Sequence, residues 1–343
     1  MKLNETQKTI VRQLFLNPVV CRKKLAHTLG LSNPGLTLAV RPLVDEGIIA
    51  FAPKIVTGRA GRNEEPLCLN PNFGYFAGID VTVSSYHLVL ISLAGFTVFE
   101  EDYSEVGPVL EKLKYFVGNS KVLNVCVTFR HYGCHKAFTE HESKIYEALK
   151  DYKDVPLFFE NTVAALADIH RLYHYSEGIS LLVKYGPELV AAVLKGDSIL
   201  RNAKSECSQI GLTLLPNGRP IGEFVEYKAL FGKELEEEEG AEKLLADKSR
   251  LDPIIDAIAF AAYNADRLFV FDHIIFAGAI LSDEEVRGKL LEKMSSMGDR
   301  FDASKVTIFE NYNEIISQKP ALEALITYLL KQLNHPSGGR CEN

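Results

Sequence analysis

Apolar residues in the first fifty positions recur at helical spacing, in three short segments separated by breaks. The spacing predicts helices at Glu5–Leu16, at Arg22–Leu29 and from Ser32 onward. Asn17-Pro18 and Gly30 separate them, since both steps interrupt helical backbone. Each segment has one apolar face: Ile10, Val11, Leu14 and Phe15 in the first, Leu25, Ala26 and Leu29 in the second, and Leu36, Val40 and Leu43 in the third.

The third segment also carries a polar stripe. Ser32 supplies a polar cap and Pro34 lies in the first turn, which is the usual start of a helix. Asn33, Thr37 and Arg41 follow at intervals of four and therefore share a second face. Short polar side chains with one arginine suit a recognition helix that reads base edges in the major groove. We therefore expect these residues, Ser32 included, to contact DNA.

A short basic hairpin is predicted to follow the third helix. Pro42 is expected to kink or end that helix, and Gly47 closes the helical part. Two strands, Ile48–Ala52 and Pro66–Leu69, then flank a tip rich in Gly and Arg, as in the wing of a winged helix-turn-helix. Arg59 and Arg62 of the tip are expected to enter a minor groove or hold phosphate, and Arg22 and Lys23 to contact phosphate. A helical protein-interaction module with a solvated basic hairpin is the alternative.

Charge divides the chain at the same place. The first 70 residues hold ten Lys and Arg against five Asp and Glu, whereas the rest hold 28 against 40. A basic segment on an acidic body is the arrangement expected when only one part of a protein touches phosphate. The charge division therefore favours the nucleic-acid-binding interpretation of residues 1–70.

The pattern beyond residue 70 predicts an α/β body. Strands alternate with helices, and a Gly186-Pro187 turn joins two of the strands. The expected strands are Tyr75–Val81, His87–Leu93, Val122–Phe129, Val155–Glu160, Ile179–Tyr185, Leu189–Lys195 and His273–Ala277, and the expected helices are Thr162–Tyr173 and Pro253–Phe269.

Composition favours a cytoplasmic protein without a membrane segment. No stretch of eighteen apolar residues is present, and the N-terminus lacks the apolar core of a signal peptide. The six cysteines are scattered without a Cys-x-x-Cys pair, which suits reduced thiols better than a disulfide framework.

The order of these segments resembles the ROK family of repressors and sugar kinases over almost the whole chain. "RKKLAHTLGLSNPGLTLAVRPLVDEGII" resembles the family's winged helix-turn-helix, and "PLFFENTVAALAD" resembles its strand-to-helix site motif. "GDSILRNAKSECSQIGLTLLPNGRP" is similar to the stretch after its phosphate-binding hairpin, and "NADRLFVFDHIIFAGAI" to the segment that borders adenosine.

The resemblance implies a winged helix-turn-helix at residues 1–70 and an actin-like, ribonuclease H-like body at residues 71–343. The body would form two α/β lobes around a cleft: lobe one at about 71–172 plus a C-terminal helix at about 318–335, and lobe two at about 173–317. A homodimer or larger homo-oligomer bound to double-stranded operator DNA is implied, with the regulator acting as a repressor.

The kinase chemistry of the family is incomplete in this chain. A ROK kinase has an Asp general base directly after an Asn, whereas Thr162 follows Asn161 here. An alignment shifted by two residues would put Glu160 in that role. Phosphate turns need glycines, but Asp80-Val81-Thr82-Val83 has none, and Tyr185-Gly186-Pro187-Glu188 adds a proline and an acid. We therefore expect no enzyme activity and no cofactor; a carbohydrate kinase with an appended DNA-binding head is the alternative.

Metal ligands are also missing where the family holds zinc. The matching stretch is Gln209-Ile210-Gly211-Leu212, and residues 216–231 contain no cysteine. Cys207 is expected to be a small buried hydrophobe. His131, Cys134, His135 and His141 form a second group with metal-ligand side chains, for which an ordinary loop is the favoured interpretation.

Some sugar-binding groups remain. Asn161 and Gln209 stand at two family sugar positions, with Glu160 beside them, so the cleft is expected to sense a sugar or a related small molecule, if any. A body that only dimerises is the further alternative. The acidic run Glu234–Glu239 is expected to be a solvated helix face.

Overall fold

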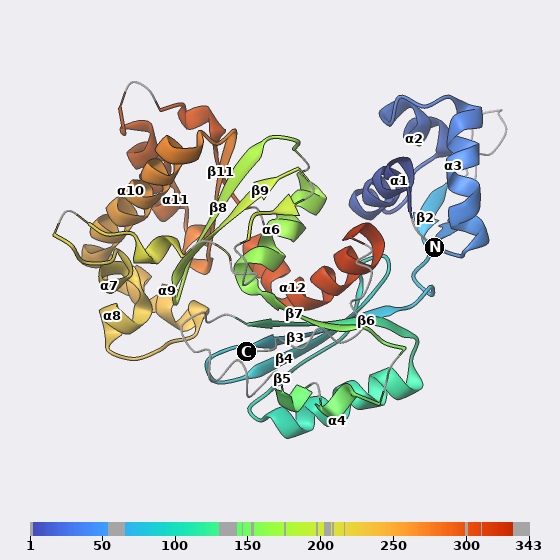
Figure 1. Cartoon of the computed structure of the whole chain (residues 1–343), viewed down its shortest axis with the longest axis horizontal. Helices are drawn as coiled ribbons and strands as arrows, with labels where there is room; N and C mark the ends of the chain where they lie inside the picture. Colours follow the sequence, from blue (N-terminus) through green and yellow to red (C-terminus); the bar gives the residue numbers. More distant parts are fainter. Residues whose placement is uncertain are drawn as a thin grey trace.

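The computed structural model describes residues 3–53, 66–129 and 143–331, except residues 146, 152–153, 175, 197, 202–206, 208, 216, 299–300 and 310. The N-terminal part, here called the head, consists of three helices and a two-stranded antiparallel sheet, and it projects from the rest of the molecule (Figure 1). Its elements are α1 (Glu5–Leu16), α2 (Arg22–Thr28), α3 (Asn33–Asp45), β1 (Ile49–Phe51) and β2 (Leu67–Leu69).

Local capping explains where the helices of the head begin. The Asn4 side chain accepts a hydrogen bond from the Gln7 backbone N–H at 2.9 Å, and the Gln7 side-chain oxygen accepts one from the Asn4 backbone N–H at 3.1 Å. Ser32 caps α3 by accepting from the Gly35 N–H. Pro42 was expected to kink or end α3, and it does not end the helix, which continues to Asp45 with Pro42 inside its last turn.

The rest of the chain forms two five-stranded sheets of the same design. In each sheet a central strand pairs antiparallel with the next strand along the chain on one side, and parallel with later strands on the other side. Lobe one contains the order β5-β4-β3-β6-β7, and lobe two contains β10-β9-β8-β11-β12. The strands are β3 (Tyr75–Val81), β4 (Tyr86–Ser92), β5 (Thr97–Tyr103), β6 (Val122–Phe129), β7 (Leu157–Asn161), β8 (Ile179–Tyr185), β9 (Leu189–Lys195), β10 (Ser198–Ile199), β11 (His273–Ala277) and β12 (Val306–Ile308).

Helices cover these sheets, and two of them lie between the lobes (Figure 1). Amphipathic α4 packs on lobe one through Val109, Leu113 and Val117. α6 and α12 pack against each other and contact both lobes. The helices are α4 (Val106–Asn119), α6 (Thr162–Tyr173), α7 (Gly222–Val225), α8 (Tyr227–Phe231), α9 (Glu237–Ala246), α10 (Leu251–Phe269), α11 (Glu284–Ser295) and α12 (Tyr312–Ile326).

The last helix begins earlier than expected and contacts the lobe-one sheet closely. We expected a C-terminal helix at about 318–335; α12 begins at Tyr312, and after Ile326 the helical backbone continues as a π-helix from Thr327 to Lys331, the last described residue. Gly78 of β3 permits the approach, because a Cβ there would lie 2.3 Å from the Ala321 backbone nitrogen and 2.6 Å from the Pro320 Cβ. The close approach carries Lys319 into the interior, where it is fully buried.

A buried ion pair secures this packing. The Lys319 ammonium lies 2.8 Å from Oδ1 of Asp80 on β3, and both side chains are almost inaccessible to water. Thr128 of β6 donates to the same carboxylate oxygen at 2.6 Å, and Lys319 also donates to the Thr162 hydroxyl at 3.1 Å. Because each charged group is hydrogen-bonded, the cost of burying it is offset only while its partners remain.

We therefore expect Lys319→Met to destabilise the protein by about 3–5 kcal/mol, since it leaves the Asp80 carboxylate buried without its cation. Urea unfolding measures this cost. Lys150→Met is the control, because Lys150 forms an exposed pair with Glu147 whose loss costs about 1 kcal/mol or less. A cost for Lys319→Met no larger than that of the control would contradict the assigned role of the pair.

Candidate functional site

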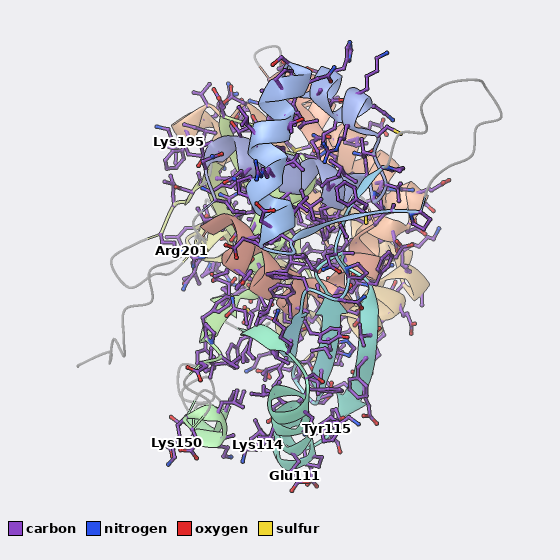
Figure 2. The ribbon with its side chains drawn as sticks, turned by 90° about the vertical axis from the view of Figure 1, so that its right-hand side faces the viewer. Glu111, Lys114, Tyr115, Lys150, Lys195 and Arg201 are labelled. Carbon is purple, nitrogen blue, oxygen red and sulfur yellow. The ribbon has the colours of Figure 1, made fainter. Side chains whose placement is uncertain are left out.

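The outer face of the head presents the residues predicted to read DNA. α3 lies on the side of the head away from lobe two, and Figure 2 shows it in front of the body. Asn33, Thr37 and Arg41 are all exposed along this helix. The Thr37 hydroxyl donates to the Asn33 carbonyl at 2.9 Å, whereas Arg41 makes only a loose pair with Asp45, 3.8 Å away, and its side chain is 79% exposed. Its guanidinium can therefore turn toward a partner at little cost.

Leu38 is a residue of this face that the sequence analysis missed. It lies next to Thr37 on α3 and is 74% exposed, although α3 buries Leu36, Val40 and Leu43. The sequence did contain a signal for Leu38, because it is an apolar residue outside the stripe of α3 that faces inward. A side chain of this kind can contact the thymine methyl group that each A·T pair presents in the major groove.

The predicted phosphate contacts lie beside the base of the hairpin. Lys23 is exposed near the start of α2, and the Arg22 guanidinium lies 5.5 Å from the centre of the exposed Phe51 ring of β1. A cation over an aromatic ring is held in place without losing its charge. Arg59 and Arg62 lie outside the described residues, so their contacts stay predictions.

The predicted effector residues are partly committed to contacts within the protein. Glu160 pairs with Arg201 at 2.7 Å, and Asn161 caps α6 by accepting from the Val163 N–H at 2.7 Å. Gln209 is exposed before the short turn η1 (Ile210–Leu212), and within the described residues no hydrogen bond or ion pair joins it to Glu160 or Asn161. Glu160 and Asn161 therefore lie side by side, whereas in the described part of the chain Gln209 takes part in none of their hydrogen bonds or ion pairs.

Thr162, the residue after Asn161, has no side-chain group that could accept the proton of a sugar hydroxyl. The Thr162 side chain donates to the Phe129 carbonyl at 2.8 Å and accepts from Lys319. Asp80, the nearest carboxylate in this network, is paired with the same lysine. The Lys319 ammonium thus lies within hydrogen-bond distance of both Asp80 and Thr162.

The acidic run Glu234–Glu239 is only partly a solvated face, so that expectation was wrong for two of its members. Glu237 is fully buried, 2.8 Å from the Lys184 ammonium, and it accepts hydrogen bonds from the Ala279 N–H and the Tyr312 hydroxyl. Glu236 points instead toward lobe one. The spacing of residues could not predict the burial of Glu237, because Lys184 and Tyr312, whose side chains contact it, are distant in sequence.

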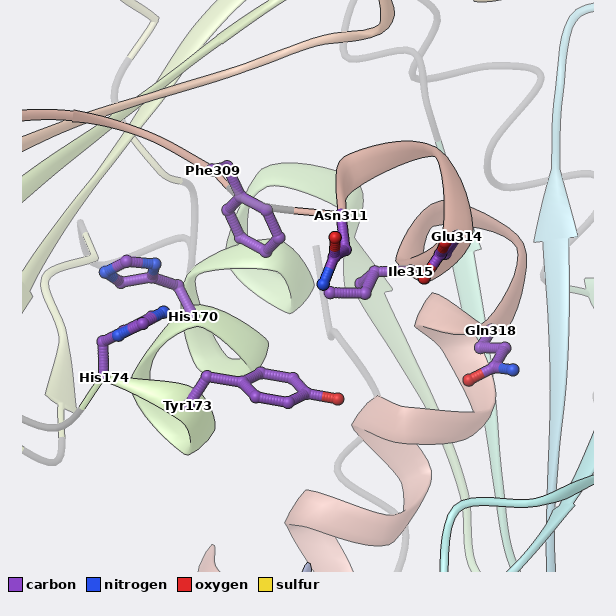
Figure 3. Close-up of a pocket in the computed structure, with 8 residues that line it drawn as sticks. All are labelled: His170, Tyr173, His174, Phe309, Asn311, Glu314, Ile315 and Gln318. Carbon is purple, nitrogen blue, oxygen red and sulfur yellow. The ribbon is translucent and has the colours of Figure 1, made fainter. Parts of the chain in front are cut away.

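A surface cavity of about 190 Å³ lies where α6 meets the start of α12 (Figure 3). Figure 3 shows the His170 and His174 rings on one side and Asn311 and Ile315 opposite them. Its lining residues are His170, Tyr173, His174, Phe309, Asn311, Glu314, Ile315 and Gln318. Tyr173 also contacts the head, because its ring packs edge-on against Phe15 of α1 with centroids 6.2 Å apart.

His170 and Tyr173 both line this cavity and both have perturbed pKa values, and burial raises that of the Tyr173 hydroxyl. Burial lowers the pKa of His170 to about 4, and the neighbouring His174 and His273 contribute further. Its ring centroid lies 5.0 Å from that of His174 and 5.6 Å from that of Phe309. At neutral pH it is therefore an uncharged imidazole that can donate or accept a hydrogen bond.

Residues 209–212, the stretch matched to the family's zinc site, lie in the described part of the chain. Leu212, which stands where the family has His, is 62% exposed, and Cys207 is buried as predicted. Within the described ranges, no three His, Cys, Asp or Glu side chains gather as metal ligands. The group from His131 to His141 lies outside those ranges. No helix in the described part is both long and apolar enough to cross a membrane.

Comparison with known proteins agrees with this geometry. Residues 3–50 match the winged helix-turn-helix DNA-binding family. The xylose repressor of Staphylococcus xylosus is 20% identical over 235 residues, which are 62% of this chain and 61% of the repressor. The chain thus matches less than two thirds of that repressor's length.

Solved structures show the same architecture. A ROK family transcriptional regulator, a homologue of the E. coli MLC protein, superposes with a TM-score of 0.61 and 13% identity over 96% of this chain and all of its own. The chain has the ROK fold. Two further structures match the body. A ROK family protein from Streptococcus pneumoniae in complex with sucrose superposes with a TM-score of 0.60 and 13% identity over 75% of this chain and 99% of its own. The ROK hexokinase of Thermus thermophilus superposes with a TM-score of 0.56 and 14% identity over 74% of this chain and 99% of its own.

These similarities confirm two predictions. The resemblance to the ROK family and the fold class, a winged helix-turn-helix followed by an α/β body of the sugar-kinase type, are both correct. The head is therefore a winged helix-turn-helix DNA-binding domain.

The lowered pKa of His170 predicts an acid sensitivity of folding. The unfolded histidine has a pKa near 6.5, so the unfolded state binds the proton first, and stability present above pH 6.5 is lost as the pH falls toward 4. Between pH 7.5 and pH 5 we expect His170→Gln to remove up to about 2 kcal/mol of this pH dependence. Urea unfolding at pH 7.5 and pH 5 measures it, with His27→Gln on the exposed face of α2 as control. Equal pH dependence in the wild type and the His170 variant would refute the assignment.

Proposed function

We propose that this ROK-type chain is a DNA-binding transcriptional regulator, acting as a repressor on operator DNA in the cytoplasm. The observation that carries the proposal is the outer face of α3, where Asn33, Thr37 and Arg41 are exposed and aligned on the helix that enters the major groove in this class of domain. The basic charge of residues 1–70 supplies the attraction to phosphate.

Each predicted contact residue then has a separate task. Asn33, Thr37 and Arg41 read base edges, and Ser32 at the cap of α3 approaches a phosphate. Arg22 and Lys23 fix the position of the head on the backbone, and Arg59 and Arg62 extend the contact through the wing. The ROK resemblance supports a homodimer or a larger homo-oligomer, in which two heads would bind paired half-sites of an operator.

A sugar or a sugar derivative is the proposed effector. The similar xylose repressor carries the name of a sugar, and a structure with the same body fold holds sucrose. In this chain Glu160, Asn161 and Gln209 are the proposed ligand-binding groups. Ligand bound near β7 would change the angle between the lobes and hence the spacing of two heads on DNA.

Kinase activity is not part of the proposal, although similar structures include kinases. Three features support this: Thr162 replaces the general base, the Lys319 ammonium is paired with Asp80, and Glu160 is paired with Arg201. A hydroxyl that donates to a carbonyl, without a carboxylate acceptor, cannot take a proton from a sugar.

The proposal predicts salt-sensitive binding to DNA from upstream of the protein's own gene. Arg41→Ala should weaken this binding by about 1–3 kcal/mol and relax sequence preference, because Arg41 reads a base. Lys23→Ala should weaken binding to all sequences and reduce the salt slope by about 1, because Lys23 contacts phosphate. Fluorescence anisotropy at several salt concentrations, with and without candidate sugars, measures both effects.

Lys150→Ala is the control for that experiment, since Lys150 lies on lobe one at the end of the molecule opposite the head (Figure 2). A wild-type protein without salt-sensitive binding would overturn the proposal. So would an Arg41 variant with the affinity of the control.

The carbohydrate-kinase alternative makes an opposite prediction. In a coupled assay with Mg-ATP and a panel of sugars, we expect no sugar-dependent release of ADP. Release that Glu160→Ala abolishes would instead establish a kinase, with Glu160 as its general base.

A further inference from the structure

Glu236 of lobe two makes three hydrogen bonds with lobe one. Its Oε1 atom accepts hydrogen bonds from the Ser84 backbone N–H at 2.9 Å and from the Ser84 hydroxyl at 2.8 Å. The Thr82 hydroxyl lies 2.8 Å from the same oxygen. These three donors belong to the turn between β3 and β4, more than 150 residues away along the chain.

The donor turn has a fixed shape of its own. The backbone N–H of Thr82 donates to the Ser85 carbonyl at 2.9 Å, and the Ser85 N–H donates to the Thr82 hydroxyl at 3.0 Å. The Thr82 hydroxyl also lies 3.1 Å from the Ser85 carbonyl and 2.8 Å from the Ser85 hydroxyl, so Glu236 is one of its three acceptors. A backbone N–H and two hydroxyls converging on one oxygen form a strong acceptor site for an anionic group.

Glu237, the residue after Glu236, fixes the backbone from which the Glu236 side chain extends to lobe one. Glu237 is fully buried in lobe two, where Lys184, the Ala279 N–H and the Tyr312 hydroxyl hold its carboxylate. Gly186 leaves the space for this pair, because a Cβ there would lie 2.8 Å from the Lys184 Nζ and 3.1 Å from the Glu237 Cδ. Since Glu237 cannot move without breaking these contacts, Glu236 extends from a rigid support.

We propose that Glu236 is an interlobe latch. Its carboxylate takes the place of a ligand anion on the Thr82–Ser84 turn and holds lobe one against lobe two. The contact is charge-assisted but lies near the surface, where Ser84 is exposed, so that water or a competing anion can replace it. The latch therefore biases the hinge toward the closed arrangement and can be released.

The Ser84 amide provides a direct test. Its N–H is protected from solvent exchange only while the Glu236 carboxylate accepts it, because Ser84 itself is exposed. We expect Glu236→Ala to accelerate exchange at Ser84 by about tenfold or more, and Glu236→Gln, which keeps one acceptor oxygen without the charge, by a smaller factor. We also expect a larger radius of gyration in small-angle X-ray scattering for Glu236→Ala.

Two controls separate a lost latch from a damaged fold. Glu239→Gln changes an exposed carboxylate of the same helix, which pairs with Lys243, and should alter neither readout. The Ala279 amide, which donates to buried Glu237, should keep its slow exchange in every variant if lobe two is intact. The double variant Thr82→Val, Ser84→Ala removes both hydroxyl donors on the lobe-one side of the contact. It should show the same larger radius of gyration as Glu236→Ala.

Unchanged exchange at Ser84 in Glu236→Ala would overturn the proposal. An unchanged radius of gyration despite faster exchange would also overturn it, because the contact would then not restrain the lobes. Neither measurement involves DNA or a sugar, so its outcome is independent of the proposed regulatory function.

Discussion

The buried pair between Lys319 and Asp80 is the interaction on which the arrangement of the body depends. An ammonium ion in the protein interior is stable only beside an anion and other acceptors, so α12 must lie where Lys319 reaches β3. Gly78 makes that approach possible, and the Thr128 and Thr162 hydroxyls complete the hydrogen bonding. One side chain thus joins the last helix, the lobe-one sheet and the start of α6.

Charged side chains of the protein lie close to the two turns, after β3 and after β8, that the ROK resemblance implies to be phosphate-binding. Lys319 is paired with Asp80, Glu236 lies on the turn that follows β3, and Glu237 is paired with Lys184 at the end of β8. Each group makes a contact between segments distant in sequence. Two buried ion pairs and the Glu236 contact thus hold these distant segments of the body together.

The sequence predicted the elements that local patterns determine. The helices of the head, the strands β3, β6, β8, β9 and β11, and α6 follow apolar spacing and clear breaks, so their bounds agree with the structure to within one or two residues. β5 and α4 were missed: β5 is an exposed edge strand with three acidic residues among seven, and so lacks an apolar alternation.

Side-chain partners were harder to predict, because they depend on packing between distant segments. The acidic run before α9 has the pattern of a solvated helix, and only the fold shows that Glu236 and Glu237 face other elements. Lys319 and Glu323, four residues apart in an apolar helix, were a visible signal of a buried polar site. Pro42 inside α3 shows that packing of an apolar face can retain a helix through a residue that local rules place at its end.

Hydroxyl-radical footprinting on DNA from upstream of the gene tests most directly whether α3 reads an operator. The account predicts two protected segments whose centres are separated by one helical turn, about 10–10.5 base pairs, or by a multiple of it. It also predicts that Thr37→Ala combined with Arg41→Ala erases the protection at a protein concentration that saturates wild-type binding. Protection without a defined spacing, or protection that survives in the double variant, would contradict the central claim that the outer face of α3 recognises DNA.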